Sequence, residues 1–408
     1  LGATLGRVLF YDKRLSRNDS ISCSSCHQQE HAFGDLARAS TGVAGVTGRH
    51  SMRLVNARFG NEVRFFWDER AANLEAQSTQ PIQDHIEMGF SGTNGDPDID
   101  DLVAKLSAIE EYRVLFTGVY GDPLVSEIRI QRALAQFVRS IQSFDSKYDA
   151  GRGRVVNDNA PFPNFTVEEN AGKRLFMTPP NAGGAGCAIC HQPPEFSIVP
   201  NSGNNGVTGT LGGGTDFRVT RSPTLRDVVD ASGVPHGAFM HDASRPSLRS
   251  VIAHYNAIPA LVPGLDPRLT RPGGPPGPAG DLPQRLNLDG QEVESLVAFL
   301  ETLTGTKVYT DPKWADPFDA SGSLNLIVLP AIIEGMSKGA DEMTLRSRGV
   351  PNLTYQVQWS ADLAFANSAP VVADANGELV VSLPLSPGES RMFYRFVYEP
   401  DTGGVGGQ

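Results

Sequence analysis

The sequence predicts a mostly α-helical protein with two related domains, followed by a small all-β domain. Three observations lead to this prediction: two copies of a Cys-x-x-Cys-His pattern, a repeated helical stretch before each copy, and a change of hydrophobic period near Ser323. At 408 residues the chain is long enough for two or three domains with separate cores. We place these domains at residues 1–155, 156–320 and 321–408.

The two Cys-x-x-Cys-His copies contain all four cysteines of the chain: Cys23, Cys26 and His27 form the first copy, and Cys187, Cys190 and His191 form the second. This pattern is the attachment signature of a c-type haem, in which two thiols bind the porphyrin and the following imidazole ligates the iron. A zinc site would need its two Cys pairs about 15–20 residues apart, and a redox dithiol needs no following histidine. The sequence therefore predicts two covalent haems.

Helical periodicity predicts the elements of the first two domains. A helix is expected at 1–11, and its segment 6–10, Gly-Arg-Val-Leu-Phe, has a counterpart at 172–176 before the second Cys pair. We further expect a compact aromatic segment at 56–68, a short helical stretch through Leu74 that Pro81 stops, and amphipathic helices at 100–116, 126–144 and 291–303, the last capped by Gly305. A linker is predicted at 151–163, and surface loops at 201–214 and 263–283.

From about Ser323 onward, apolar and polar residues alternate, which is typical of strands. The dipeptide Asn376-Gly377 predicts a hairpin turn. This part of the chain contains neither Cys nor His, and we expect it to form a β-sandwich-like domain. The alternating residues are Tyr355, Val357 and Trp359, and then Met392, Tyr394, Phe396 and Tyr398.

Composition narrows the possible partners and the compartment. The net charge of −11 argues against nucleic acid or an anionic membrane as a partner and fits a small basic protein. No apolar run approaches the roughly 18 residues that a membrane span needs. Covalent haems require an oxidising compartment, so we expect a bacterial periplasmic or extracellular protein. The chain begins at Leu1 without a visible signal peptide, and we expect that its natural N-terminus has been removed.

With both haem motifs, the stretch Phe-Trp-Asp-Glu-Arg-Ala at 66–71, Pro81-Ile82 and Glu87-Met88 in view, the chain resembles the bacterial di-haem cytochrome c peroxidases and their MauG-like relatives. The resemblance covers about residues 1–308 and leaves out the β-rich tail. It implies that both haem domains are cytochrome-c-like. It also implies that the N-terminal haem meets hydrogen peroxide and that the C-terminal haem passes electrons to it.

The resemblance also assigns residues to the peroxide site. Trp67 matches a family tryptophan between the haems, Gln77 and Glu87 match peroxide-pocket residues, and Pro81 lies beside them. Peroxide cleavage needs a group that takes a proton from one oxygen and returns it to the other, which Glu87 can do if burial raises its pKa. Gln77 would orient peroxide by hydrogen bonds. Read without the resemblance, these residues would be a core tryptophan and two solvated side chains.

The sixth ligand of the second haem has two candidates. Tyr255 stands, after Ser247-Leu248, where peroxidases carry a methionine and MauG-like members a tyrosine, and Met240 is the competitor 15 residues upstream. A thioether raises the haem potential and suits electrons from a donor cytochrome or copper protein, whereas a phenolate stabilises oxidised iron. We favour Tyr255, which points to oxidation of a protein or organic substrate.

Further assignments concern the other histidines and a calcium ion. The resemblance implies an interdomain Ca²⁺ held in part by Asn56, for which a buried hydrogen-bonding asparagine is the alternative. His50 is a candidate ligand that closes the first haem. His31 and His85 are expected at the surface or behind the ligands, His241 in a structural role near the second haem, and His236 and His254 receive no role.

Taken together, these features predict a peroxide-dependent di-haem oxidoreductase. One alternative is an electron-carrier cytochrome with both irons six-coordinate, which would not need the set of Trp67, Gln77 and Glu87. Another is a binding module that the β-rich tail anchors to a partner.

Overall fold

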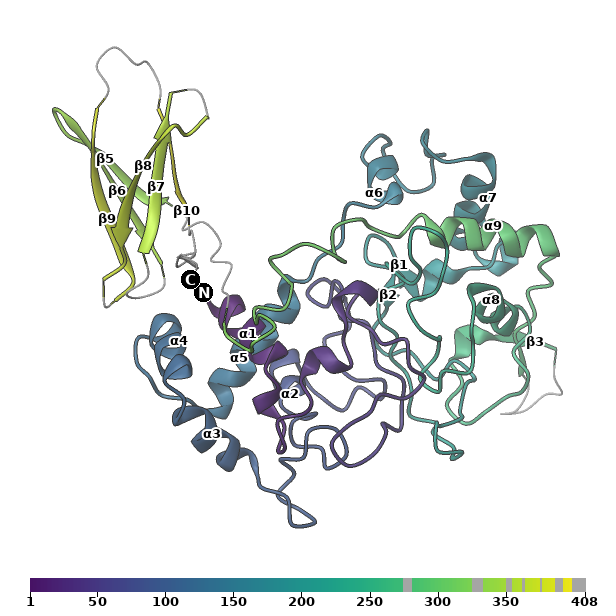
Figure 1. The fold of residues 1–408 in the computed structure, drawn as a ribbon. Helices are drawn as coiled ribbons and strands as arrows, with labels where there is room; N and C mark the ends of the chain where they lie inside the picture. The colour runs from purple at the N-terminus through teal and green to yellow at the C-terminus, as the bar shows by residue number, and fades with distance from the viewer. Residues whose placement is uncertain are drawn as a thin grey trace, which may run out of the picture.

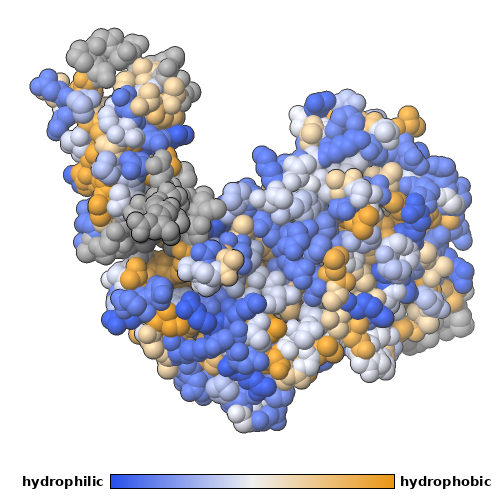
Figure 2. Space-filling view, in the orientation of Figure 1, coloured by the Kyte–Doolittle hydropathy of each residue, from blue (hydrophilic) through white to orange (hydrophobic). Residues whose placement is uncertain are grey.

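The computed structural model of the chain describes residues 1–273, 281–324, 333–349, 354–361, 364–374, 376–385 and 392–397. Its helices form one broad body, and the strands β5–β10 form a separate block beside it (Figure 1). Within the described ranges, no helix is long and apolar enough to cross a membrane. On the visible face of the helical body, hydrophobic residues are interspersed among hydrophilic ones (Figure 2).

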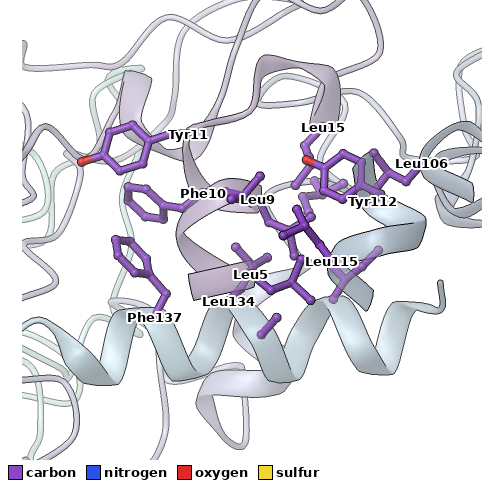
Figure 3. Packing of buried hydrophobic residues seen from close by; sticks show 14 of the residues in the cluster. Leu5, Leu9, Phe10, Tyr11, Leu15, Leu106, Tyr112, Leu115, Leu134 and Phe137 are labelled. Carbon is purple, nitrogen blue, oxygen red and sulfur yellow. The ribbon is translucent and has the colours of Figure 1, made fainter. Parts of the chain in front are cut away.

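The first group of helices surrounds the N-terminal helix. It comprises α1 (Gly2–Tyr11), α2 (Leu74–Ser78), α3 (Ile99–Ser107), α4 (Glu110–Tyr120) and α5 (Glu127–Ser140). Helices α1 and α5 lie so close that an added Cβ on Gly6 would come within 1.9 Å of the Ala133 carbonyl oxygen. Leu5, Leu9 and Phe10 of α1 pack here against Leu134 and Phe137 of α5 (Figure 3).

A second group of helices repeats this packing. It comprises α6 (Lys147–Arg152), α7 (Val167–Met177), α8 (Leu248–Asn256) and α9 (Gly290–Glu301). An added Cβ on Gly172 of α7 would come within 1.8 Å of the Ser295 carbonyl oxygen on α9. The sequence repeat at 6–10 and 172–176 therefore corresponds to the same glycine contact between two helices. Two short strand pairs, β1 (His191–Gln192) with β2 (Ser197–Ile198) and β3 (Thr270–Pro272) with β4 (Asp281–Pro283), complete this part.

Two predicted helix boundaries in the first part are wrong. The helix expected at 100–116 is two helices, because the backbone of Ile109 is extended and α4 starts anew with two glutamates in its first turn. The helix expected at 126–144 ends at Ser140. The backbone beyond it pairs elsewhere, since the carbonyl of Ile141 accepts a hydrogen bond of 3.0 Å from the Asn56 N–H.

Other local expectations also need correction. The short helical stretch expected through Leu74 and stopped by Pro81 is the helix α2, which begins only at Leu74, where Asn73 caps it, and ends at Ser78. Thr302, and not Gly305, ends α9. The loop at 201–214 was expected at the surface because of its glycines, but the Asn204 side chain is completely buried beneath it. The Asn204 amide donates to the carbonyls of Val207 and Val219. These hydrogen bonds satisfy buried polar groups, so a polar residue of this loop can lie in the interior.

The segment after α9 returns to the first helical group. The Trp314 side chain is buried there, and its indole N–H donates to the Ser140 carbonyl over 3.0 Å. The Tyr11 hydroxyl in turn donates to the Trp314 carbonyl. Val308 and Trp314 thus belong to the core around α1, although our division at residue 320 assigns them to the second domain. The division into domains stays a prediction.

The tail contains the expected strands in two three-stranded antiparallel sheets. One has the order β10 (Phe393–Val397), β7 (Thr354–Ser360), β8 (Asn367–Val372), and the other β5 (Ile333–Lys338), β6 (Glu342–Arg348), β9 (Glu378–Pro384). Tyr355, Val357 and Phe396 are buried, as their alternation predicts, and Tyr398 lies outside the described residues. The turn before Gly377 joins β8 to β9, which belong to different sheets, so the hairpin predicted there is wrong.

Candidate haem sites

The first Cys-x-x-Cys-His stretch forms a tight turn that ends in a fixed imidazole. Residues Cys23–Ser25 make a short 3₁₀ helix, and the His27 N–H donates to the Cys23 carbonyl over 3.0 Å. The Nδ1 of His27 lies 3.0 Å from the Phe33 carbonyl oxygen. Ala32 and Phe33 both have left-handed backbone, with φ of 56° and 57°. This costly conformation turns the Phe33 carbonyl towards the imidazole.

The second stretch has the same arrangement. Residues Cys187–Ile189 form a 3₁₀ helix, and the Nδ1 of His191 lies 3.0 Å from the carbonyl oxygen of Phe196. Phe196 is left-handed as well, with φ of 54°. The two motifs thus share the sequence pattern, the turn and a phenylalanine carbonyl behind the imidazole.

This geometry fits covalent haem. A hydrogen bond from Nδ1 to a carbonyl fixes the tautomer that leaves Nε2 free to ligate iron. Burial lowers the pKa of His27, and it lowers the pKa of His191 to about 4; both shifts favour the neutral imidazole that a metal ligand needs. All four cysteines are free, and each pair stands directly before its histidine.

Beside His27 lies a cavity of about 500 Å³. Its wall contains Cys26 and His27 and also four residues that the sequence assigned to the peroxide site: Trp67, Gln77, Pro81 and Glu87. Gln77 reaches the cavity from α2, and Glu87 from the turn that follows Pro81. The structure therefore brings these separated positions together around one imidazole.

Glu87 has the electrostatic character of an acid–base group. Burial, reinforced by the neighbouring Asp84 carboxylate, raises the pKa of Glu87 to about 7, although Arg70 opposes the shift. No hydrogen bond to the Glu87 carboxyl group contributes to this shift. The backbone holds it in place, because its carbonyl accepts from the Val43 N–H. Gly42 is needed for this contact, since an added Cβ there would come within 2.8 Å of the Glu87 Cα.

Trp67 lines this cavity and also a second one. Its indole N–H donates to the His50 carbonyl over 2.8 Å, and its ring lies 6.2 Å from the His241 ring. His50 also lines both cavities, and its Nδ1 is 3.3 Å from the Arg38 carbonyl oxygen. Trp67 and His50 are therefore part of the wall between the two cavities.

The second cavity, of about 190 Å³, holds the other motif and both candidates for the sixth ligand. Its wall includes Cys187, Cys190 and His191 together with Met240 and Tyr255. Burial raises the pKa of Tyr255 to about 12, while a hydrogen bond from Asn205 acts in the opposite direction. The residue Met240 has a left-handed backbone, with φ of 69°.

The remaining predicted residues have ordinary partners. The amide of Asn56 exchanges two hydrogen bonds with the backbone of Ser143, at 3.0 and 2.8 Å. This is the alternative to calcium binding that we named above, and the calcium site stays a prediction. The other histidines face protein groups: His85 bonds to Asp96, His241 to the Gly209 carbonyl, His254 to the Asn205 carbonyl, and His31 lies 5.9 Å from His236.

Sequence reasoning missed several residues of these sites. Arg70 lines the His27 cavity, stacks on Phe66 at 3.5 Å and donates to Asp68. It stood in the quoted stretch 66–71, but its side chain received no role. Asn205 lies in a glycine-rich loop, and nothing in its local sequence indicated a contact with Tyr255.

Comparison with known proteins bears on both sites. A profile of the di-haem cytochrome c peroxidase family matches residues 2–154. The chain is 29% identical over 316 residues to methylamine utilization protein MauG of Methylophilus methylotrophus, covering 74% of this chain and 82% of that protein. It is 30% identical over 311 residues to MauG of Methylorubrum extorquens, covering 73% and 77%. The crystal structure of a MauG-like protein associated with microbial copper homeostasis is 28% identical, with a TM-score of 0.58 over 78% of this chain and 93% of that one.

Proposed function

Because the chain belongs to the di-haem cytochrome c peroxidase and MauG family, we propose that it reduces hydrogen peroxide at the His27 site with Glu87 as the acid–base group. The chain is a di-haem oxidoreductase of the peroxidase class and carries two c-type haems. When bound, the haems supply the iron at which peroxide reacts and the redox equivalents that the reaction consumes. The roles of the two sites and of individual residues are our proposal.

The position of Glu87 in the His27 cavity carries this proposal. With a pKa of about 7, its carboxyl group is present in both protonation states near neutral pH. It can therefore accept a proton from one peroxide oxygen and return it to the oxygen that leaves. Gln77 lines the same cavity and does not titrate, so we assign it to orienting peroxide by hydrogen bonds.

At the second site we propose Tyr255 as the sixth ligand of the haem on His191. Tyr255 lines the same cavity as both cysteines of that motif. An anionic oxygen ligand would favour oxidised iron and let this haem share the oxidising equivalent of the first. Trp67, in the wall between the cavities, would then carry electrons between them.

The wider setting follows from the same assignments. We infer a periplasmic or extracellular bacterial protein, since covalent haem attachment needs an oxidising compartment. Two cytochrome-c-like haem domains and a β-sandwich-like tail are the arrangement we propose. A Ca²⁺ ion near Asn56 belongs to the same proposal. The electrons would come from a donor cytochrome, a copper protein or a protein substrate.

Replacing Glu87 by glutamine tests the central assignment. Glu87→Gln keeps the shape and removes the titrating group, so both haems should be retained while the reaction with peroxide slows by roughly 10²–10⁴-fold. Rapid-mixing absorption spectroscopy of the haem-loaded full chain measures this rate. Glu30→Gln, at an exposed glutamate, is the matched control and should react like the unaltered protein. An unchanged rate in Glu87→Gln would assign the proton transfer to another group.

A further inference from the structure

Asn205 contacts both candidates for the sixth ligand of the second haem. Its Nδ2 lies 3.1 Å from the Tyr255 hydroxyl oxygen and 3.5 Å from the Met240 sulfur. An amide nitrogen can only donate, so the Tyr255 oxygen must accept in this contact. A donor aimed at this oxygen suits a phenolate, because hydrogen bonds to charged oxygens are the stronger ones.

The orientation of the Asn205 amide is fixed by the surrounding loop. Its Oδ1 accepts from the Val207 N–H over 3.1 Å, and a flipped amide would lose this bond. Its backbone carbonyl accepts from Nε2 of His254, the residue before Tyr255 on α8. Gly206, with φ of 87°, lets the loop approach the end of that helix closely, as an added Cβ would lie 3.0 Å from Ile258. The loop and α8 are thus held together at Tyr255.

We propose that Asn205 is a positioning residue of the second haem site, which holds the Tyr255 oxygen towards the iron and draws negative charge from it. The inference rests on the proposed function, because it takes Tyr255 as the sixth ligand. A thioether is a weak acceptor, so the same N–H favours the oxygen of Tyr255 over the sulfur of Met240.

The Asn205 N–H should also affect the reduction potential of the second haem. A phenolate oxygen keeps more negative charge on ferrous than on ferric iron, and a hydrogen bond to it is then stronger. The Asn205 N–H therefore stabilises the reduced state more than the oxidised state. Removing this donor should lower the reduction potential of the second haem.

Two substitutions of Asn205 in the haem-loaded full chain test this consequence. Asn205→Leu keeps the branched shape of the side chain but lacks the donor. Asn205→Asp keeps an acceptor for the Val207 N–H but also lacks the donor. In Asn205→Leu we expect the preference of the site for ferric over ferrous iron to rise about tenfold. For a one-electron couple this corresponds to a fall of about 59 mV in the reduction potential of the second haem. In Asn205→Asp the two anionic oxygens repel, and the Tyr255 oxygen should leave the iron. Redox titration and resonance Raman detection of phenolate coordination measure these effects.

Asn204→Asp is the matched control for loosening of the loop. The Asn204 amide donates to the Val207 and Val219 carbonyls, so this variant disturbs the same loop without removing the contact to Tyr255. An equal fall in potential in Asn204→Asp, or an unchanged potential in both Asn205 variants, overturns the proposal. Lack of phenolate coordination in the unaltered protein overturns it together with the assignment of Tyr255. The peroxide rate of Glu87→Gln reports on the His27 site. It therefore tests the assignment of proton transfer to Glu87 independently of the Asn205 variants.

Discussion

Replacing Glu87 by glutamine should stabilise the folded protein above pH 7 while it slows the reaction with peroxide. Burial raises the pKa of this carboxyl group from 4.5 to about 7, with a contribution from Asp84. One pKa unit corresponds to about 1.4 kcal/mol of free energy, so the ionised Glu87 side chain costs the folded state about 3 kcal/mol. This is a large share of the roughly 5–15 kcal/mol that separates folded from unfolded proteins.

The pH range of the effect follows from the direction of the shift. Below pH 4.5 the Glu87 carboxyl is protonated in both the folded and the unfolded chain, and the cost is absent. Between pH 4.5 and 7 the unfolded chain has lost this proton while the folded chain retains it, so the free energy of unfolding falls as pH rises. Glutamine does not titrate. The stability gained by Glu87→Gln should therefore grow from near zero at pH 4.5 to about 3 kcal/mol above pH 7.

Urea unfolding of the haem-loaded protein at pH 4.5 and pH 8 measures this gain. The slope of the free energy against urea should be the same for both proteins, so that a shift in midpoint reports stability alone. Glu30→Gln again serves as the control at an exposed position. Equal free energies of unfolding for Glu87→Gln and the unaltered protein at pH 8 would refute the reasoning, because Glu87 would then be a solvated carboxylate.

Three further outcomes are expected. Tyr255→Met should raise the potential of the second haem in a redox titration, because a neutral sulfur replaces an anionic oxygen. Met240→Leu conserves volume and should leave the spectrum and potential of that haem nearly unchanged; the opposite pattern would make Met240 the ligand. Gly172→Ala should destabilise the protein by about 1–3 kcal/mol in the same urea assay, because its Cβ would lie within 1.8 Å of the Ser295 carbonyl oxygen. Gly290→Ala, which meets no atom within 4 Å, should not.

The parts of the site that depend on consecutive residues could be predicted from the sequence. Cys23, Cys26 and His27 act through one turn of chain, so their spacing alone indicates a haem. The carbonyl that fixes the imidazole could not be predicted. It belongs to Phe33, whose left-handed backbone is rare outside glycine, and residue type gives no sign of it. The same holds for Phe196 in the second motif.

Asn205 shows how composition misleads at a loop. Glycine and polar residues in the loop at 201–214 predicted a surface position. In the structure the glycines let the backbone of this loop approach α8. Asn204 bonds to the Val207 carbonyl, and Asn205 bonds to Tyr255 and His254 of that helix. The helix at 100–116 failed for a related reason. The apolar residues of the two helices α3 and α4 keep one helical period through Ile109. The backbone nevertheless becomes extended at Ile109 and changes direction there, which the sequence period does not reveal.

The wall between the two cavities limits how any substitution in it can be interpreted. The segment 50–53 and Trp67 line both cavities, and the Trp67 carbonyl accepts hydrogen bonds from the N–H groups of Thr220 and Arg221. A change at Trp67 therefore reaches segments that line both cavities. Slower electron transfer in such a variant would support the role proposed for the indole only if the potentials of both haems stayed the same. Measuring both potentials together with the transfer rate separates conduction through Trp67 from a shift of the wall that it anchors.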